Sequence, residues 1–471
     1  MSVANTHYGA NRIGELLKDK KSIFFVGVGG INMSSLAHVS LFGGMKVGGS
    51  DRVRSHLTER LEREGVEVVY SHDEKNLDGY EALVYTVAIS EDNPEYCRAV
   101  REGIPCISRA DYMGYLMMAY SKRIGVSGMH GKSTCTSMCA SVLIGANTDP
   151  TVLSGAELGI MGGAYRVSES SREFFLFEAC EYMDSFLDFN PNIAVVLNIE
   201  MDHVDYFKSM EHIRRSYAGF ASIASDDENG CVIANADDDE VRVALANTKA
   251  RLVSFGIENE SADVRALDIE CKKGRYSFDI IAKGEKICRV ELKVSGYHNM
   301  YNALASAAVA LECGLDGQQI KRGLEAFGGA ARRMEYKGEV CGVSVYDDYA
   351  HHPTEIRATL EGAKKMTEDG GRLWCVFQSH TYSRTAALLD GFAESLAIAD
   401  KVLVCDIYAA REENVYGISP EILASKIDGA RAVHGFEEPA VLLKEELREG
   451  DVAIIMGAGD VWKVFSYLDL K

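Results

Sequence analysis

The chain has 471 residues and a formal net charge of −20 at pH 7, with 47% hydrophobic and 25% charged residues. This length exceeds what one hydrophobic core usually organises, so two or three domains are expected. The composition is that of a globular protein and excludes a disordered or fibrous chain. The acidic balance argues against nucleic-acid or membrane partners, which need a basic face, but is compatible with small anionic ligands.

The sequence predicts a cytoplasmic protein with reduced cysteines. The opening segment, MSVANTHYGANRIGELLKDKK, contains no apolar core of signal-peptide length, and no later run approaches a membrane span. The 12 cysteines are scattered without a CxxC pair, which argues against a disulfide framework. Cys135 and Cys139 share one face of an expected helix, where we favour core packing over redox chemistry.

Short apolar runs rich in β-forming residues alternate with amphipathic segments along most of the chain, which predicts βαβ units and parallel sheets. The expected strands lie within residues 22–30, 66–71, 81–89, 122–128, 173–180, 192–200, 372–378, 401–408 and 451–459. Residues 262–296 break this alternation and predict a small antiparallel patch. The expected fold class is α/β, with three domains at residues 1–118, 119–328 and 329–471.

A first glycine-rich turn lies in FFVGVGGINMSSLA, between an expected strand and an expected helix. Gly27, Gly29 and Gly30, with Asp51 about 20 residues further on, make up most of a dinucleotide-binding fingerprint. The third glycine of that fingerprint is replaced by Asn32. We therefore expect a bound phosphate group at this turn, while a plain tight turn and several different diphosphates, NAD among them, remain open.

A second glycine-rich loop lies in GVSGMHGKSTCTSM, residues 125–138, and is shorter than the common ATPase pattern. Val126 occupies the place of the usual first glycine, and Gly128 opens the loop three residues before Gly131. Backbone N–H groups from Gly128 to Ser133 are expected to surround a phosphate, Lys132 to neutralise its charge, and the Ser133 hydroxyl to ligate Mg²⁺.

Two acidic clusters follow expected strands of the same domain. FLFEACEYMDSFLDF carries Glu178, Glu181 and Asp184, and VVLNIEMDHVDYF carries Asp202, His203 and Asp205. One such cluster alone is usually a solvated turn, and Glu181, Asp184 and Asp205 are each compatible with a surface or supporting position. Because parallel strands present their carboxyl ends at one edge of a sheet, two clusters beside a Gly-Lys-Ser loop predict a metal-nucleotide site.

These motifs, together with GYHNMYNALAS, ARRME, DDYAHHPTEI and FQSHTYSR, resemble in order and over nearly the whole chain the Mur ligases of peptidoglycan synthesis. The resemblance implies a Rossmann-like N-terminal domain that holds UDP, a central ATP-binding domain and a Rossmann-like C-terminal ligase domain. It also implies an ATP- and Mg²⁺-dependent enzyme that joins L-alanine to the lactyl carboxylate of UDP-N-acetylmuramate. The reaction that the resemblance implies passes through an acyl phosphate and releases ADP and phosphate.

The same resemblance implies the roles of individual residues, which fall into four sets. The residues expected to act in catalysis are Lys132, His203, Asp348, His352 and Arg384. The residues expected to bind ATP are Gly128, Met129, His130, Gly131, Lys132, Ser133, Thr134, Asn299, Asn302, Arg333 and Asp348. The residues expected to bind the other substrates are Gly29, Gly30, Ile31, Asn32, Asp51, His351, His380 and Arg384. The expected metal ligands are Ser133, Glu178 and His203.

The sequence departs from the family pattern at Asn32, Met129, Cys180 and Thr381. A threonine commonly stands in place of Met129, an aspartate in place of Cys180, and an arginine in place of Thr381. Several other Mur ligases use a carbamylated lysine after the DH motif, but HIRRSYAGF offers no lysine, so none is expected. These departures leave open whether substrate contacts are altered.

Three alternatives to this function stay open on the sequence. A nicotinamide-dependent oxidoreductase would explain the first glycine turn. It would leave the second glycine loop and the two acidic clusters without a function. A non-catalytic nucleotide-binding regulator is compatible with the departures at the four positions above. A recycling ligase that joins a tripeptide to the same sugar nucleotide is the alternative within the family. The preference for L-alanine over glycine or L-serine, the group that takes the amine proton and the oligomeric state are not predicted.

Overall fold

The computed structural model describes residues 3–203, 206–368, 370–410 and 412–471. Its contacts divide the chain into two compact units. The first comprises Met1–Val264 and Ala305–Ile320, and the second comprises Arg265–Leu304 and Lys321–Lys471.

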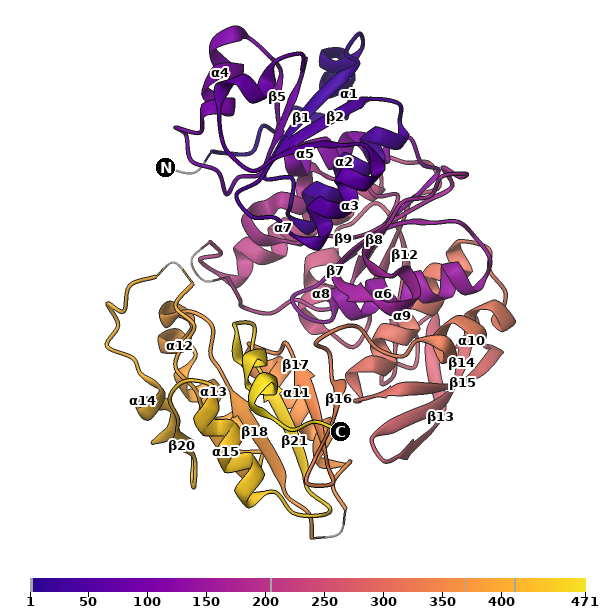
Figure 1. Cartoon of the computed structure of the whole chain (residues 1–471). Helices are drawn as coiled ribbons and strands as arrows, with labels where there is room; N and C mark the ends of the chain where they lie inside the picture. The colour runs from indigo at the N-terminus through magenta and orange to yellow at the C-terminus, as the bar shows by residue number, and fades with distance from the viewer. Residues whose placement is uncertain (1–2, 204–205, 369, 411) are drawn as a thin grey trace. The chain divides into compact units, whose positions relative to one another are not determined.

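The first unit begins with a five-stranded parallel sheet, of which Figure 1 labels β1, β2 and β5. The strand order is β3-β2-β1-β4-β5. Side chains of β1 alternate between its faces, because successive residues of a strand point to opposite sides. Ile23 and Phe25 pack in the same core as residues of α1 and α5, whereas Phe24 and Val26 pack in a second core with Ala99 of α4. The strands are β1 (Ser22–Val26), β2 (Lys46–Ser50), β3 (Glu67–Val69), β4 (Leu83–Tyr85) and β5 (Cys106–Ser108). The helices are α1 (Gly9–Leu17), α2 (Ile31–Phe42), α3 (His56–Glu64), η1 (Glu74–Leu77), α4 (Pro94–Glu102) and α5 (Arg109–Met117).

A second sheet of this unit contains the strands β12-β11-β10-β6-β9-β7-β8 in that order. All neighbouring pairs are parallel except β7 and β8, which form an antiparallel pair. The strands are β6 (Lys122–Ser127), β7 (Thr151–Leu158), β8 (Gly163–Arg166), β9 (Phe174–Glu178), β10 (Ile193–Val196), β11 (Cys231–Asn235) and β12 (Arg251–Gly256). The helices are α6 (Lys132–Gly145), η2 (Gly159–Met161), η3 (Tyr182–Asp188), α7 (Met210–Ala224) and α8 (Asp239–Leu245). The central position of β6 places the loop that follows it between the ends of β9 and β10.

The antiparallel patch expected within residues 262–296 is present. It consists of β13 (Val264–Lys272), β14 (Arg275–Ala282) and β15 (Glu285–Ser295), with β14 between the other two. The helices α9 (His298–Glu312) and α10 (Gly317–Ala326) follow it in the chain.

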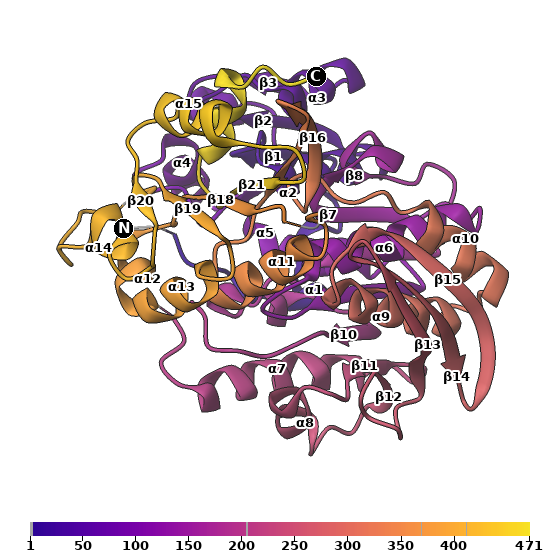
Figure 2. The same ribbon diagram turned by 90° about the horizontal axis from the view of Figure 1, so that it is seen from below.

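The C-terminal sheet has the order β16-β17-β21-β18-β19-β20, and only the β16–β17 pair is antiparallel. Helices cover both of its faces, with α11 and α13 on one side and α15 on the other (Figure 2). The strands are β16 (Glu335–Val340), β17 (Val343–Asp348), β18 (Leu373–Phe377), β19 (Lys401–Val404), β20 (Arg431–Ala432) and β21 (Val452–Met456). The helices are α11 (Pro353–Lys364), α12 (Tyr382–Ala387), α13 (Leu389–Leu396), α14 (Pro420–Ala424), α15 (Glu437–Glu446) and η4 (Val461–Tyr467).

Each of the nine strands expected from apolar runs is present, and the α/β fold class is confirmed. Antiparallel pairing is not confined to residues 262–296, since β7–β8 and β16–β17 are further hairpins. The β16–β17 turn consists of Cys341 and Gly342 at φ 53° and 79°, a left-handed pair that matches the twist of a two-residue hairpin. Within the described residues, no helix is both long enough and apolar enough to span a bilayer.

Candidate functional site

The second glycine loop joins the central strand β6 to the N-terminus of α6. Gly128 and Gly131 have φ of 146° and 81°, a region that side-chain-bearing residues rarely adopt. A Cβ at Gly128 would also lie 2.9 Å from the Cβ of Leu197. The two glycines therefore let the chain turn sharply into α6, so that the first N–H groups of this helix face a position suited to an anion.

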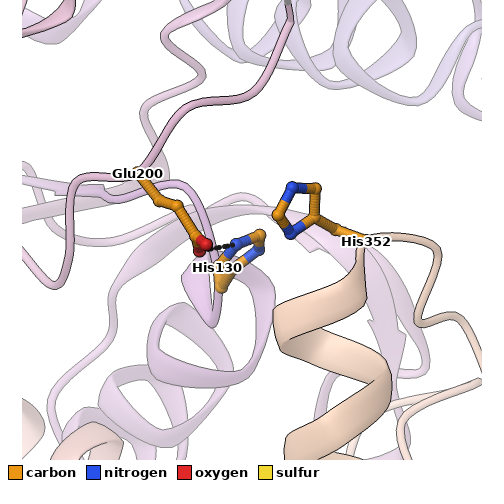
Figure 3. Close-up of side chains that lie close together, drawn as sticks. All are labelled: His130, Glu200 and His352. Atoms are coloured by element: carbon orange, nitrogen blue, oxygen red, sulfur yellow. Dashed lines mark hydrogen bonds and ion pairs between the residues drawn. The ribbon is translucent and has the colours of Figure 1, made fainter. Parts of the chain in front are cut away.

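The loop is held by Asn198, which directly follows the strand β10 and Leu197. Met129 donates its backbone N–H to the Asn198 carbonyl at 3.2 Å. The Asn198 side chain accepts from the His130 N–H at 2.8 Å and donates to the His130 carbonyl at 2.9 Å. The His130 ring lies 3.0 Å from a carboxylate oxygen of Glu200 (Figure 3). The loop backbone is thus fixed by the neighbouring strand end, while the Met129 side chain packs into the core.

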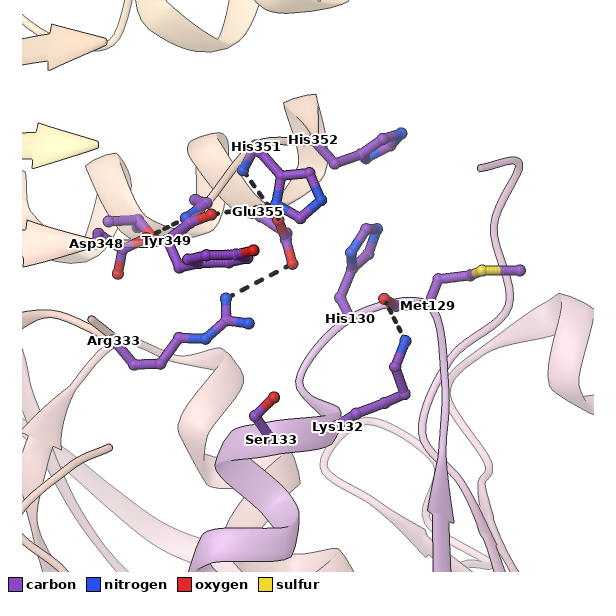
Figure 4. Close-up of polar contacts among 12 residues, drawn as sticks. Met129, His130, Lys132, Ser133, Arg333, Asp348, Tyr349, His351, His352 and Glu355 are labelled. Atoms are coloured by element: carbon purple, nitrogen blue, oxygen red, sulfur yellow. Dashed lines mark hydrogen bonds and ion pairs between the residues drawn. The ribbon is translucent and has the colours of Figure 1, made fainter. Parts of the chain in front are cut away.

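Lys132 folds back over its own loop. Its ammonium group donates to the carbonyls of Gly128 at 2.6 Å and Met129 at 3.2 Å (Figure 4), and it lies 3.0 Å from a carboxylate oxygen of Glu181. Burial lowers the pKa of Lys132, but the acidic groups around it, Glu181 foremost and Glu178 beside it, together outweigh burial, and the pKa is raised. The lysine is therefore charged at neutral pH, as phosphate binding requires.

Glu178, the last residue of β9, contacts the first turn of α6. Its Oε2 accepts from the Ser133 hydroxyl and from the Gly155 N–H, both at 2.9 Å. A Cβ at Gly155 would lie 2.3 Å from that oxygen, so only glycine leaves room for the carboxylate. A hydroxyl and a carboxylate side by side at a phosphate loop form a donor set that suits Mg²⁺, which takes oxygen ligands from protein and phosphate together.

His203 is paired with Glu181, whose side chain is fully buried. The distance from His203 Nε2 to Glu181 Oε1 is 3.1 Å. Asp184 accepts from the Tyr206 hydroxyl at 2.6 Å and so has a supporting contact. Asp205, which the sequence placed in the same cluster, lies outside the described residues. Among the residues described, the ligand atoms of Glu178, Glu181 and His203 do not all lie within 4.8 Å of one another.

The first glycine turn joins β1 to α2 and has the geometry of a helix N-terminus that faces solvent. Gly30 caps α2, and Gly30, Ile31 and Asn32 are exposed. Asp51 accepts from the Gly29 N–H at 2.8 Å, so its carboxylate supports the turn. The exposed N–H groups that follow Gly29 suit an anion.

In the second unit, Asn299 and Asn302 lie one turn apart on α9 and are buried. Asn299 donates to the Ser295 carbonyl at 2.7 Å, and Asn302 donates to the Asn299 side-chain oxygen at 3.1 Å. This chain of bonds fixes the orientation of both amides.

Arg333 lies just before β16, and Asp348 is the last residue of β17, the strand that pairs with β16. The Arg333 guanidinium lies over the ring of Tyr349, and one of its nitrogens is 3.8 Å from Glu355 (Figure 4). Asp348 accepts from the N–H groups of Met334 at 2.8 Å and of Ala350 at 2.9 Å, and burial raises its pKa. Asp348 therefore holds the backbone of two segments, one before β16 and one after β17. These contacts agree with a positioning role for Asp348 better than with a role as a proton acceptor.

Of the expected substrate-binding residues of this unit, His351, His380 and Arg384 lie near one another. The His351 and His380 ring centroids are 6.2 Å apart, and the Arg384 charge contributes to lowering the pKa of both histidines, after burial, to about 4 in His351. His352 caps α11 and accepts from the Thr354 N–H at 3.4 Å through Nδ1. His351 and His380, whose pKa values are lowered, are thus neutral imidazoles beside the Arg384 guanidinium, an arrangement that suits an anionic ligand group.

Thr381 is the N-cap residue of α12. Its hydroxyl accepts from the Arg384 N–H at 3.4 Å and caps α12, although its φ is 68°. A β-branched residue in that region is strained, so the cap has a structural cost.

The structure adds three residues that the sequence analysis did not assign to the site: Asn198, Glu181 and Glu355. Each lies inside a motif already quoted, and Glu181 was weighed there only as a surface or supporting residue. Its burial contradicts the surface position, and its contacts with Lys132 and His203 agree with the supporting one.

Three sequence models of Mur ligase domains match the chain in order. The model described as "Mur ligase family, catalytic domain" matches residues 22–121, "Mur ligase middle domain" matches residues 126–310, and "Mur ligase, glutamate ligase domain" matches residues 332–459.

Curated relatives match over almost the whole chain. The UDP-N-acetylmuramate–L-alanine ligase of Clostridium novyi (strain NT) is 43% identical over 453 residues, which is 95% of this chain and 97% of the relative. The ligase of the same name from Caldanaerobacter subterraneus subsp. tengcongensis is 44% identical over the same shares. The crystal structure of UDP-N-acetylmuramate-alanine ligase MurC from Thermotoga maritima matches with a TM-score of 0.76 at 26% identity, covering 95% of this chain and 98% of that one.

Proposed function

The chain belongs to the Mur ligase family, and we propose that it joins L-alanine to the lactyl carboxylate of UDP-N-acetylmuramate at the expense of ATP. The observation that carries this proposal is the phosphate loop with its charged Lys132, in a chain more than 40% identical to ligases of that name. The nicotinamide-dependent alternative loses its basis, because the first glycine turn belongs to a ligase. The expected cytoplasmic location and the domain boundaries at 118/119 and 328/329 stay predictions.

The chemistry begins with a carboxylate, which is a poor electrophile because attack adds charge to an anion. In the proposed first step, an oxygen of the lactyl carboxylate attacks the γ-phosphorus of ATP and ADP leaves, which gives an acyl phosphate. Lys132 offsets the repulsion between the two anions, and the N–H groups from Gly128 to Ser133 hold the phosphates. To reach a phosphate oxygen, Lys132 exchanges one of its loop carbonyl contacts, since its three donors are engaged by the protein.

In the second step, the α-amine of L-alanine attacks the acyl phosphate carbon, loses a proton and expels inorganic phosphate. We assign the amino-acid carboxylate to Arg384, whose paired donors match a carboxylate, with His351 and His380 beside it. The amine proton goes to solvent or to a group such as His352 or Asp348. Asn299, Asn302, Arg333 and Asp348 are assigned to ATP, and the turn at Gly29 to Asn32 to the UDP group.

Mg²⁺ is part of the proposal, because the donors around the phosphate loop fit it. Ser133 is assigned to a first ion, and Glu178 and His203 to a second. The ions supply charge compensation for the phosphate oxygens and the carboxylate. Replacing Glu178 by Gln should raise the Mg²⁺ concentration needed for half-maximal activity, whereas Glu173→Gln, a change at an exposed residue just before the same strand, should not.

A phosphate-release assay with ATP, Mg²⁺ and UDP-N-acetylmuramate, run across the common amino acids, tests the function. We expect release that depends on the sugar nucleotide and is fastest with L-alanine. No release with any amino acid would overturn the proposal and favour the regulator alternative, and faster release with a tripeptide acceptor would favour the recycling ligase.

The order of the two steps has its own test. Without an amino acid, ATP and UDP-N-acetylmuramate should form an acyl phosphate that hydroxylamine traps as a hydroxamate. Replacing Arg384 should lower amide formation more than trapping, because its assigned partner enters only in the second step. Equal losses of amide formation and of trapping would show that Arg384 acts in the first step instead.

A further inference from the structure

A single buried carboxylate, that of Glu181, joins the phosphate loop to the histidine assigned to the second metal. Its Oε2 lies 3.0 Å from Lys132 Nζ, and its Oε1 lies 3.1 Å from His203 Nε2. The Glu181 side chain is 0% exposed, compared with 12% for Lys132 and 24% for His203. The carboxylate is thus enclosed by its two partners.

The contact determines which nitrogen of His203 carries a proton. A carboxylate that faces an ammonium group, as Glu181 faces Lys132 at 3.0 Å, is an acceptor of hydrogen bonds. The proton of a neutral His203 ring therefore lies on Nε2, where Glu181 accepts it. Nδ1 then has its lone pair free for a metal ion, and metal-bound histidines usually donate their other ring N–H to a carboxylate in this way.

The backbone of His203 supports a fixed orientation of its imidazole ring. Its φ is 48°, a left-handed value that is uncommon outside glycine, and its N–H donates to the Asp202 side chain at 2.6 Å. The ring of Tyr182 packs against the His203 ring with centroids 5.0 Å apart. A strained backbone that persists is held by its surroundings, and here those surroundings fix the direction of one imidazole.

We propose that Glu181 is a positioning residue for the second metal ion: it holds the Nε2 proton of His203 and thereby directs Nδ1 at the metal. Lys132 balances the charge of this carboxylate inside the protein. The inference rests on the proposed function, because the metal ion is part of that function.

The tautomer is tested on the metal-free enzyme by ¹⁵N NMR with labelled histidine, using His203→Ala to assign the signal. We expect a protonated Nε2 and an unprotonated Nδ1 in the parent enzyme, and a mixture of tautomers in Glu181→Met. A proton on Nδ1 of the parent would overturn the inference. This measurement needs neither substrate nor metal, so it does not depend on ligase activity.

Metal affinity is tested by electron paramagnetic resonance of Mn²⁺ bound in the presence of a non-hydrolysable β,γ-methylene analogue of ATP. Glu181→Met should weaken the second Mn²⁺ about 10- to 100-fold and spare the first. Glu181→Gln, which keeps an oxygen to accept from Nε2, should lie closer to the parent. Equal affinities for the second Mn²⁺ in the parent and in Glu181→Met would overturn the inference.

Glu95→Gln is the matched control, because Glu95 is also fully buried and also contacts a histidine, His72, at 3.1 Å in the N-terminal sheet region. It should bind both Mn²⁺ ions as the parent does. If the parent ligates and Glu181→Met binds metal normally, this inference alone fails. If the parent never ligates, the proposed function fails and the tautomer measurement decides the inference.

Discussion

The side-chain amide of Asn198 makes two hydrogen bonds with the backbone of His130: it accepts one from the His130 N–H at 2.8 Å and donates one to the His130 carbonyl at 2.9 Å. The amide thus exchanges a pair of hydrogen bonds with one residue of the loop, as two paired residues of neighbouring β-strands do. The two residues are 68 positions apart in the sequence. It fixes the middle of the phosphate loop to the end of the neighbouring strand.

Replacing Asn198 by Leu should therefore weaken nucleotide binding. Two lost hydrogen bonds at about 1 kcal/mol each correspond to at most a roughly 30-fold lower affinity for ATP. The matched control is Asn192→Leu, which removes a similar amide bridge, to the Arg123 N–H and the Ser121 carbonyl, at the other end of β6. Both variants should lose stability, but only Asn198→Leu should change the nucleotide titration. Equal nucleotide affinities in the two variants would contradict the role of Asn198.

Lys132→Met should abolish ligation and also lower the melting temperature. The second effect follows because the change leaves the buried Glu181 carboxylate without its cation, a loss of about 3 to 5 kcal/mol. Lys132→Met/Glu181→Gln should recover part of the stability without recovering activity. Thermal unfolding and phosphate release check the two effects separately. A single variant as stable as the parent would show that the ion pair contributes nothing to folding.

Gly155→Ala should disturb metal binding through Glu178. The added Cβ would lie 2.3 Å from the Glu178 oxygen that accepts from Ser133, so the carboxylate has to move. We expect a higher Mg²⁺ requirement with little loss of stability. Gly159→Ala is the control, because a Cβ there meets no atom within 4 Å. An unchanged Mg²⁺ requirement in Gly155→Ala would show that the position of Glu178 does not matter.

Asp347→Asn should stabilise the protein at high pH. Burial raises the pKa of Asp347 to about 6, despite Arg332 at 3.3 Å. The folded state therefore holds a proton that the unfolded chain releases near pH 4, and the parent loses about 1 to 3 kcal/mol of stability as the pH rises from 4 through 6. The variant does not undergo this loss, so its advantage in melting temperature should grow up to about pH 7.

The control for that titration is Asp451→Asn. Asp451 is also buried, but Arg372 at 2.7 Å and two backbone N–H groups outweigh the effect of burial, so its pKa is lowered. Its charge stabilises the folded state above the unfolded pKa, and Asp451→Asn should lower the melting temperature at pH 7. Equal pH profiles for Asp347→Asn and the parent would contradict the raised pKa.

The sequence by itself determined the fold class, the family and the chemical character of the loop. Apolar runs that alternate with amphipathic segments predict parallel sheets. A strand buried on both faces is apolar throughout, and a helix that covers the sheet is apolar on one face only. Gly128 and Gly131 were recognisable because a sharp turn into a helix needs residues without a Cβ. The hairpin at Cys341 and Gly342 was not predicted, because its turn lacks the Asn-Gly or Asp-Gly pair that usually marks a two-residue hairpin turn.

Only the tertiary structure decided which polar groups meet. Glu181 is 49 positions from Lys132 and 22 from His203, and its sequence context is equally compatible with a solvated surface. The three residues meet because β6 pairs with both β9 and β10, which brings the loops after three separate strands to one edge of the sheet. Strand order depends on packing between segments far apart in the chain, and that information is absent from any local pattern.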